Sequence, residues 1–429
     1  MNSSKIEPEI LATALGRLDA WLETMRAAGG YYGPAVGFRG VSMAYCGPGH
    51  DWRWEGLLDG WAERHARTGE PLFLARMEQA LRDLAAAQLL NGAFRNSSFE
   101  NNPVEGGMPH EPAVMAAAIR ACNSLTRAGR RLPEGTTAML ERFVEERLIR
   151  ELWNKLLKTF NNWLQSDFET YAPPAVASIL EVLLGYAELT GDGARLEPYV
   201  RGAADSLLAS QFASGPLAGG LPVSNRDGAS ASPYLAARCL PALAWLQRRT
   251  GETRWTAATD ALVGFLGRSA TAKGGFPFLI HARRPAAVLP VFTGAAAGTL
   301  VALHRAGRLT EELVAAHLPF VLARQTASGA FETAVGGNRR SRVSRRPDWR
   351  DVVPVVGWAD KIYHLLAILN AGTPVPAAGA AGAVQHEVKV LGVDAVFCED
   401  DHSMRLAGRT RTWFEWRKGT VWPSACELS

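Results

Sequence analysis

Acidic residues and histidines gather just before stretches that are predicted to form buried helices, where they could transfer protons. Glu111 follows His110, and Asp51 likewise follows a histidine. Asp167 and Glu169 stand ahead of the next apolar stretch. A carboxyl group or an imidazole can act as a general acid or base when its surroundings move its pKa toward the working pH. These five residues are our catalytic candidates, with Glu111 as the acid/base and Asp167 or Asp51 as its partner.

Aromatic, basic and polar residues in the same part of each repeat could bind a sugar that carries a negative charge. An indole is a large apolar surface with one polar handle, so it can stack on a sugar face. Arginine presents a fork of N–H groups that matches a carboxylate or a phosphate. The basic run at 339–346 would also suit an anionic substrate. The substrate-binding candidates are Tyr31, Trp52, Arg53, Trp54, Asn162, Asp227, His281, Arg283, Arg284 and Asp351.

Most of these candidates have a structural alternative that the sequence leaves open. Asp51 can cap a helix, and Glu111 can favour the helix dipole from the first turn. Asn162 suits a turn, and the arginines at 339–346 suit a solvated loop. His364 lies inside an apolar helical stretch, where a satisfied core histidine is commoner than a ligand. Five scattered cysteines without a CxxC spacing provide no zinc or disulfide framework, and we predict no metal and no cofactor.

The chain repeats itself about every 60 residues, in six copies. One mark of the repeat is a polar loop that leads into a helix, as at Glu111-Pro-Ala-Val and Ser232-Pro-Tyr-Leu. The other is a glycine-aromatic turn after a glutamine, as in the stretches 88–94 and 325–331. A fixed period indicates one supersecondary unit stacked on its neighbours. Here the unit is a helical hairpin, and six hairpins can close into an all-α (α/α)6 barrel.

The two helices of each unit differ in which faces are apolar. Some stretches have apolar residues at three- and four-residue steps with charges between them, which predicts one buried face and an outer ring. Other stretches, such as 113–119 and 294–300, are small and apolar nearly all round, which predicts an inner ring. The outer stretches are Ile10 to Arg26, Leu74 to Gln88, Met139 to Lys158, Tyr199 to Gln211, Trp255 to Leu266 and Glu312 to Gln325.

The connections of the repeat are short on one face of the ring and long on the other. Inner helices end in Thr-Gly turns, as at Thr190-Gly191 and Thr250-Gly251, where glycine is the expected helix cap. The loops that lead into the inner helices are long and carry most of the candidate residues, and long loops in compact domains are usually functional. This face also receives the N-termini of the inner helices, whose dipoles favour anions.

After Asn370 the helical repeat stops and the pattern changes. The stretch 373–384 is rich in proline, alanine and glycine and is predicted to be a linker between a toroid at 1–372 and an extension at 385–429. Apolar residues at 387–397 and 410–416 alternate at period two, which indicates strands. We expect a small C-terminal β appendage that folds back on the ring or pairs with another subunit as a homodimer.

Composition and charge narrow the class of protein. The 429 residues are 47% hydrophobic and 21% charged, with a net charge of +4, which is typical of a globular protein and indicates no nucleic-acid partner. The first residues lack the apolar segment of a secretory signal, and no uncharged apolar run approaches the roughly 18 residues of a membrane span. We expect a cytoplasmic protein.

Two families resemble parts of the chain. The Gln-x-x-x-Gly-x-Phe spacing at Gln88 and Gln325 resembles the repeat of squalene cyclases and protein prenyltransferases, which share an α/α toroid. Their Asp-x-Asp-Asp motif and their zinc ligands have no counterpart in this sequence, so this resemblance concerns the fold.

The second resemblance, to unsaturated glucuronyl hydrolases, runs over most of residues 1–374. The stretch from Trp54 to Glu70 looks like their first inner helix, and 186–192 is similar to the end of their third. His110-Glu111 stands where these enzymes have a His-Asp pair. The catalytic aspartate that opens their third inner helix has no match in register, because Asp167 lies several residues upstream. The resemblance implies a six-hairpin carbohydrate enzyme.

We therefore expect a carbohydrate-active enzyme of the glycoside hydrolase or hydratase type, acting on a small anionic saccharide with paired carboxylates. One alternative is a terpenoid or prenyl-diphosphate enzyme, for which a deep aromatic cavity would speak. Another is a non-catalytic toroid that binds an anionic ligand or a protein, in which the carboxylates would be unpaired and face solvent. An epimerase that uses barrel histidines is a further variant.

Overall fold

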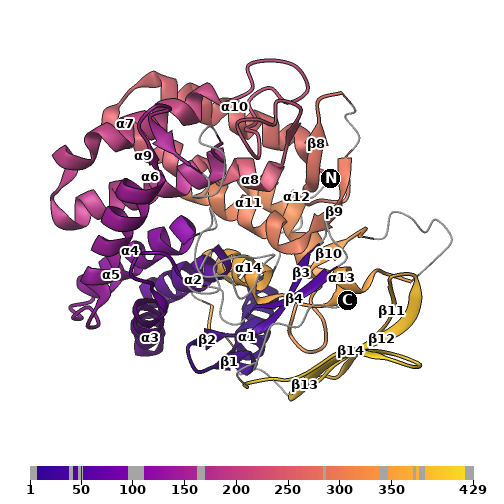
Figure 1. Ribbon diagram of the computed structural model, residues 1–429. Coiled ribbons are helices and arrows are strands. Elements are labelled where there is room, and N and C mark those ends of the chain that lie inside the picture. The colour runs from indigo at the N-terminus through magenta and orange to yellow at the C-terminus, as the bar shows by residue number, and fades with distance from the viewer. Residues whose placement is uncertain are drawn as a thin grey trace.

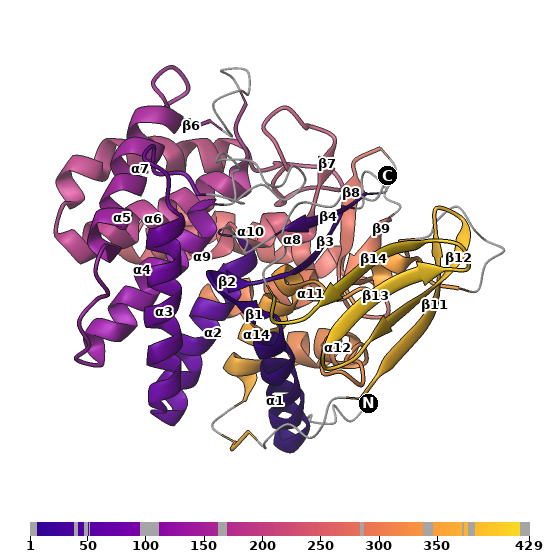
Figure 2. The same ribbon diagram turned by 60° about the horizontal axis from the view of Figure 1, so that its bottom comes forward.

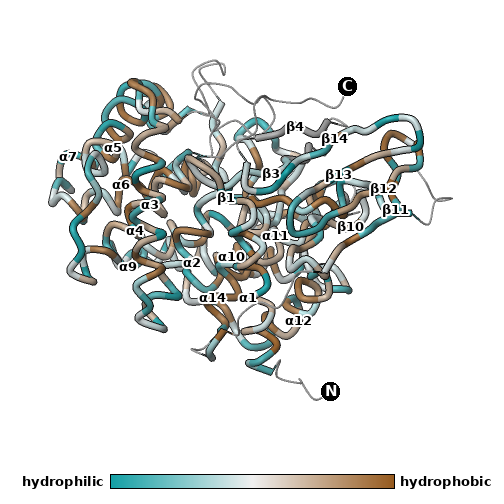
Figure 3. Tube along the Cα trace, turned by 90° about the horizontal axis from the view of Figure 1, so that it is seen from below, coloured by the Kyte–Doolittle hydropathy of each residue, from teal (hydrophilic) through white to brown (hydrophobic). Residues whose placement is uncertain are grey.

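The structure, a computed structural model, describes residues 7–37, 42–46, 50, 52–94, 111–161, 170–283, 287–337, 346–370, 373–375 and 382–420. Helical hairpins make up the body of the molecule, and a β-sheet lies at its edge (Figures 1 and 2). Hydrophilic stretches run along the outside of this body and hydrophobic ones inside it (Figure 3). This arrangement confirms the predicted all-α toroid with a small C-terminal β appendage.

An inner ring of helices forms the centre of the fold. Each inner element packs on the next, and the last packs on the first, so that the ring closes. The members are α2 (Trp52–Thr68), α4 (Glu111–Arg127), α6 (Pro173–Thr190), α8 (Pro233–Ala237) followed by α9 (Leu240–Thr250), α11 (Thr293–Arg305) and α14 (Val356–Leu369). Proline in the first turn of α6, α8 and α9 suits a helix start, because its missing N–H is not needed there. The Thr-Gly turns end α6 and α9 as predicted, with Gly191 and Gly251 in the left-handed conformation at φ 77° and 70°.

The outer ring consists of helices that bury one face against the inner ring. Its members are α1 (Pro8–Thr24), α3 (Pro71–Ala87), α5 (Thr136–Arg142) continued by a π-helix (Phe143–Leu152), α7 (Gly193–Ala209), α10 (Thr253–Ser269) and α12 (Glu311–Leu322). The helix expected at 139–158 ends at Leu152. The Asn154 side chain accepts the backbone N–H groups of Leu156 and Leu157, which favours a turn over another helical turn. The hairpin of β5 (Trp153–Asn154) and β6 (Thr159–Phe160) follows there.

The glutamine of the repeat links the hairpin turn to the neighbouring outer helix in the copies at Gln88, Gln211 and Gln325. In three copies its side-chain amide donates to the carbonyl of a turn glycine and to a carbonyl of the next hairpin. These bonds are Gln88 to Gly92 and Met139, Gln211 to Gly219 and Ala258, and Gln325 to Gly329 and Ala14, all between 2.8 and 3.1 Å. The glutamine spacing therefore serves the fold.

Short strands form in the loops that lead into the inner helices. One antiparallel sheet has the order β10-β9-β8-β7, from β7 (Ser230–Ala231), β8 (Pro277–His281), β9 (Ala287–Phe292) and β10 (Ala334–Val335). A short helix, α13 (Trp349–Val352), precedes α14. Two hairpins follow α1, one of β1 (Arg26–Ala27) with β2 (Gly30–Tyr31) and one of β3 (Gly33–Gly37) with β4 (Ser42–Cys46). The sequence did not predict these strands, which are too short to show a period.

The C-terminal sheet is a meander of β11 (Val384–Val390), β12 (Val393–Glu399), β13 (Ser403–Gly408) and β14 (Thr412–Arg417). It folds back on the ring beside α1 (Figure 2). The buried Glu399 carboxylate accepts hydrogen bonds from Trp21 at 2.7 Å and Ser328 at 3.0 Å, and pairs with Lys418 at 2.9 Å. These contacts fasten the sheet to both ends of the toroid sequence.

Among the described residues, one helical segment, Trp349–Leu369, has the length and apolar composition of a membrane span. In the structure 89% of its most apolar window is buried within the protein. It carries the sixth inner helix, so its apolar composition is explained by its place in the core.

Candidate functional site

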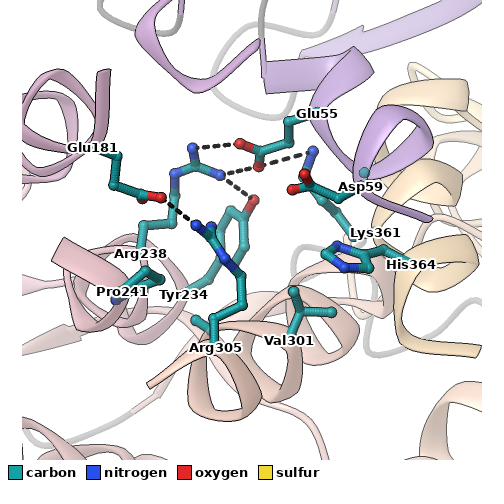
Figure 4. A pocket seen from close by; sticks show the side chains of 13 residues that line it. Glu55, Asp59, Glu181, Tyr234, Arg238, Pro241, Val301, Arg305, Lys361 and His364 are labelled. Atoms are coloured by element: carbon teal, nitrogen blue, oxygen red, sulfur yellow. Dashed lines mark hydrogen bonds and ion pairs between the residues drawn. The ribbon is translucent and has the colours of Figure 1, made fainter. Parts of the chain in front are cut away.

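The inner helices surround a cavity of about 40 Å³ whose wall is charged (Figure 4). Its side chains come from α2, α6, α8, α9, α11 and α14 and from Arg238 between α8 and α9. The polar ones are Glu55, Asp59, Glu181, Tyr234, Arg238, Arg305, Lys361 and His364. Charged residues on helices that are buried on every face need partners of opposite charge. In this ring, charged residues of different inner helices pair with one another.

Glu55, in the first turn of α2, is held between two cations. Arg238 donates to both of its carboxylate oxygens, with Nη2 at 3.0 Å from Oε2, and Lys361 Nζ lies 3.2 Å from Oε1. Burial alone would raise the pKa of the Glu55 carboxyl, but Arg238 and Lys361 hold that pKa well below its usual range. Glu55 is therefore an ionised carboxylate in the cavity wall at neutral pH.

Lys361 joins the first and last inner helices. Its ammonium donates to the Trp52 backbone carbonyl and, at 2.6 Å, to Asp360 Oδ2. That same oxygen accepts the Gly56 N–H at 2.9 Å. Burial raises the pKa of the Asp360 carboxyl to about 7, against the opposing charge of Lys361. The Trp52 carbonyl and the Asp360 carboxyl thus hold the Lys361 ammonium beside Glu55.

A second ion-pair chain lies farther along the inner helices from their N-terminal ends. Arg120 of α4 donates two hydrogen bonds to Asp59, of 2.8 and 2.7 Å, and one to Glu181 Oε2, of 2.9 Å. Arg305, the last residue of α11, donates to the same Glu181 oxygen. Burial would raise the pKa of the Asp59 carboxyl, but Arg120 keeps that pKa below its ordinary value. Two carboxylates thus balance two guanidiniums.

Tyr234 and His364 are the neutral polar groups of the cavity. The Tyr234 hydroxyl accepts a hydrogen bond from Arg238 at 3.2 Å. Gly298 makes room for its ring, since a Cβ there would lie 2.6 Å from Tyr234 Cε2. Burial lowers the pKa of His364 to about 4, although Asp59 opposes the shift, so its imidazole is neutral at pH 7. A neutral imidazole can accept or donate a proton.

An aromatic cluster adjoins this cavity through Tyr234. The Trp358 ring packs against Trp52 at 4.8 Å, Tyr234 at 5.4 Å and Phe292 at 4.7 Å between ring centroids. These residues stand at the N-terminal ends of inner helices, and Trp358 is half-buried. Trp52 was predicted from the sequence to bind substrate; Trp358 and Tyr234 were not.

The structure gives Glu111, our first catalytic candidate, two structural contacts. One carboxylate oxygen accepts the Phe94 backbone N–H at 2.8 Å, and the other accepts Arg147 Nε at 3.1 Å. Arg147 also pairs with Glu151 at 2.8 Å. Glu111 is almost fully buried and does not line the charged cavity. Its catalytic role stays a prediction. Its contacts link α4 to the outer ring.

Three other candidates near the first inner helix are core residues. Tyr31 donates its hydroxyl hydrogen bond to Glu23 at 2.8 Å and packs edge-on against Trp54 at 6.0 Å. Trp54 is 1% exposed. The buried Arg53 lies against Gly357 of α14. Packing explains the placements of Tyr31 and Trp54.

The rim candidates are dispersed. Asp227 is half-buried and accepts the Ala229 N–H at 3.1 Å within its own turn. His281 and Arg283 are exposed at the end of β8. Asp351 is buried and accepts the N–H groups of Gly336 at 3.2 Å and Gly337 at 3.0 Å. Burial raises the pKa of Asp351 to about 7 in spite of these bonds.

Six candidates lie outside the described residues, together with most of the basic run. They are Asp51, His110, Asn162, Asp167, Glu169 and Arg284. Within the part of the chain that the structure describes, no group of three or more His, Cys, Asp or Glu side chains is placed to hold a metal.

The sequence did contain a signal for the charged cavity. Arg120 and Glu181 interrupt helices that are otherwise apolar on every face, and such a charge must find a buried partner. His364 was interpreted as a core histidine on the same pattern. The sequence-based candidates lie mostly in the loops, whereas the charged cavity lies among the inner helices.

No family model matches the sequence, and no curated protein does. A solved unsaturated glucuronyl hydrolase specific for heparin has a TM-score of 0.56 at 14% identity, over 85% of this chain and 96% of that one. A D-mannose isomerase has a TM-score of 0.56 at 11% identity, over 84% and 97%. The type II terpene cyclase MstE from Scytonema has a TM-score of 0.51 at 11% identity, over 86% and 100%.

The chain has the (α/α)6 toroid fold. The toroid supports hydrolysis, isomerisation and cyclisation in these neighbours, and at such low identity the likeness concerns the fold alone. The chemistry of this toroid has to be argued from its own cavity.

Proposed function

We propose that this protein is a carbohydrate-active enzyme that binds a small anionic saccharide at the centre of the ring and hydrolyses or hydrates it. The observation that carries the proposal is the central cavity itself, with carboxylates, cations, a phenol and an imidazole converging from separate inner helices (Figure 4). Convergent polar groups in a concave site are the usual setting of catalysis. The structural neighbours that act on sugars agree with this setting.

Within this proposal Glu55 is the ionised carboxylate. Arg238 and Lys361 keep it charged, so it can stabilise positive charge that develops on the sugar. Glu181 is the second carboxylate of the pair, and the Tyr234 hydroxyl lies beside Arg238 as a proton donor. Glu111 is less suited to this role, because it does not line the cavity.

The size of the cavity sets a condition on substrate binding. A volume of about 40 Å³ holds no more than a few water molecules, whereas ligand pockets are usually on the order of 300–1,000 Å³. A saccharide therefore binds only when long side chains such as Arg305 swing aside. Arginine side chains can do so without any change in the helices.

A second candidate is an isomerase or epimerase, favoured by one observation. His364 is neutral, lines the cavity, and has Asp59 nearby to stabilise an imidazolium. Such a histidine can remove a proton next to a sugar carbonyl. A terpenoid enzyme fits less well, because the cavity wall is charged and its one aromatic side chain among the described residues is Tyr234, apart from the His364 imidazole.

The test is a product analysis by NMR on three probes, each with the purified protein. The probes are an unsaturated uronyl disaccharide, α-1,6-mannotriose and D-mannose. Loss of the double bond or of a glycosidic bond identifies the hydratase or hydrolase, and a new ketose or epimer identifies the isomerase. Glu55→Gln is expected to abolish the first activity and His364→Asn the second. If both variants turn over the active probe as fast as the parent protein, the central cavity is not the catalytic site.

A further inference from the structure

Arg305 is the most accessible of the three cations that line the cavity. Its side chain is 23% exposed, against 13% for Arg238 and 5% for Lys361. Among the described residues its one hydrogen bond runs from Nη2 to Glu181. Arg305 lines the cavity, and its other donors have no hydrogen bond to a protein partner among the described residues.

The other cations at or near the cavity, which include Arg120 at 24% exposed, each hold more hydrogen bonds to the protein than Arg305 does. Arg120 uses Nε and both terminal nitrogens on Asp59 and Glu181. Arg238 donates to Glu55, to Tyr234 and to Ser178. Lys361 has three hydrogens and three acceptors, in Trp52, Asp360 and Glu55. An added anion would have to break these contacts.

Glu181 can release Arg305 without becoming an unpaired buried charge. The oxygen that accepts from Arg305 also accepts from Arg120 at 2.9 Å, and Arg120 stays when Arg305 leaves. Glu181 itself is 6% exposed, so its carboxylate remains in place on α6. It stands where a carboxylate or phosphate of a ligand would meet Arg305.

We propose that Arg305 is the anion-recognition residue of the cavity, and that it binds the carboxylate or phosphate group of a saccharide in exchange for its contact with Glu181. This proposal rests on the proposed function for the saccharide part of the ligand. It moves charge recognition from the rim arginines to the inside of the ring. An arginine fork binds a planar carboxylate or a phosphate with two parallel hydrogen bonds.

Calorimetric titration of the full chain tests this assignment with D-glucuronate, D-glucose 6-phosphate, D-glucose and inorganic phosphate. The parent protein is expected to bind at least one of the two charged sugars about tenfold or more tightly than D-glucose. Arg305→Gln should lose that preference, and Arg305→Lys should keep part of it. Glu181→Gln should strengthen it, because a competing carboxylate is removed.

Arg308→Gln is the matched control, since Arg308 follows three residues later and pairs on the surface with Asp260 at 2.8 Å. It should bind like the parent protein. Thermal unfolding of each variant shows that loss of binding is not loss of fold.

The outcomes separate this assignment from the proposed function. Equal binding of D-glucose and both charged sugars by the parent protein overturns the role of Arg305 and leaves a sugar enzyme standing. A charge preference that survives in Arg305→Gln does the same. Binding of phosphate alone, lost in Arg305→Gln, supports the anion site and counts against a saccharide enzyme. No anion binding at all overturns the assignment.

Discussion

At the scale of single residues, the buried carboxylates either tie elements together or line the cavity. Glu111 belongs to the first kind, because its partner Arg147 is 2% exposed and the pair is shielded from water. Removing one partner of such a pair leaves an uncompensated buried charge. Glu55 belongs to the second kind, with both partners at the cavity wall.

Glu111→Ala is predicted to lower the free energy of unfolding by about 3–5 kcal/mol. Glu111→Gln should cost less, because its amide oxygen can still accept the Phe94 N–H. Urea denaturation measures both values. A Glu111→Gln protein with parental stability and no turnover would instead support the catalytic role that the sequence predicted.

The pKa of Asp351 predicts a pH dependence of stability. Its folded-state pKa of about 7 lies above the ordinary value of 3.8, so the folded protein binds the proton more tightly than the unfolded chain. The protonated Asp351 carboxyl contributes its full stability below about pH 4, and this contribution is lost as the pH rises to about 7. The free energy of unfolding falls by at most about 4 kcal/mol over this range. Asp351→Asn keeps an acceptor for Gly337 but cannot ionise. The variant should therefore gain stability relative to the parent protein as the pH rises from about 4 to about 7, as measured by urea denaturation. A constant difference over this range would contradict the buried carboxyl.

At the scale of elements, glycines set how closely the first and last inner helices approach. A Cβ at Gly56 would lie 2.4 Å from the Asp360 carbonyl oxygen, and one at Gly60 would lie 2.5 Å from the Tyr363 ring. Both helices are buried all round, so neither can shift freely. This contact joins the two ends of the toroid sequence and holds Asp360 and Lys361 in place.

Gly56→Ala is predicted to destabilise the protein by about 1–3 kcal/mol, because backbone rather than a flexible side chain must move. Gly267→Ala is the control, since a Cβ there meets open space on the exposed side of α10. Alanine in a helix is favoured over glycine by about 0.5–1 kcal/mol, so this control should be neutral or more stable. Differential scanning calorimetry compares the two. A loss as large in Gly267→Ala would show that helix packing is not the cause.

The sequence predicted an element well where its apolar period extended over many residues. It predicted an element poorly where local hydrogen bonds determine the structure. The inner and outer helices follow from apolar patterning, and the Thr-Gly caps follow from glycine at positive φ. The end of the helix at Leu152 depends on the Asn154 side chain, which no period reveals. The β7–β8 and β9–β10 strand pairs depend on contacts between different helical hairpins.

At the scale of the whole molecule, the ring brings together residues that are far apart in the chain. Glu55 meets Arg238, and Glu181 meets Arg305, across spans that the sequence alone does not connect. The sequence indicated six hairpins and a functional face, but the pairing of inner charges needs the closed ring. The C-terminal sheet lies beside α1 in the same closed arrangement (Figure 2).

Glu399→Ala is predicted to lower the midpoint of thermal unfolding and to speed hydrogen exchange in the C-terminal sheet. It removes the acceptor of Trp21 and Ser328 and leaves the buried Lys418 unpaired. Glu415→Ala on β14 is the control, because its pair with Arg405 is exposed and weak at 3.7 Å. Equal behaviour of both variants would mean that Glu399 does not fasten the sheet.

The central claim, that turnover takes place inside the ring, is tested most directly by the turnover rate of Glu55→Gln beside Glu63→Gln on the active saccharide. Glu63 lies on the same helix and pairs with Arg67 outside the cavity at 3.7 Å. We predict a loss of about 100- to 10,000-fold for Glu55→Gln and the parental rate for Glu63→Gln, with both proteins folded by thermal unfolding. A folded Glu55→Gln protein with the parental rate would contradict the claim.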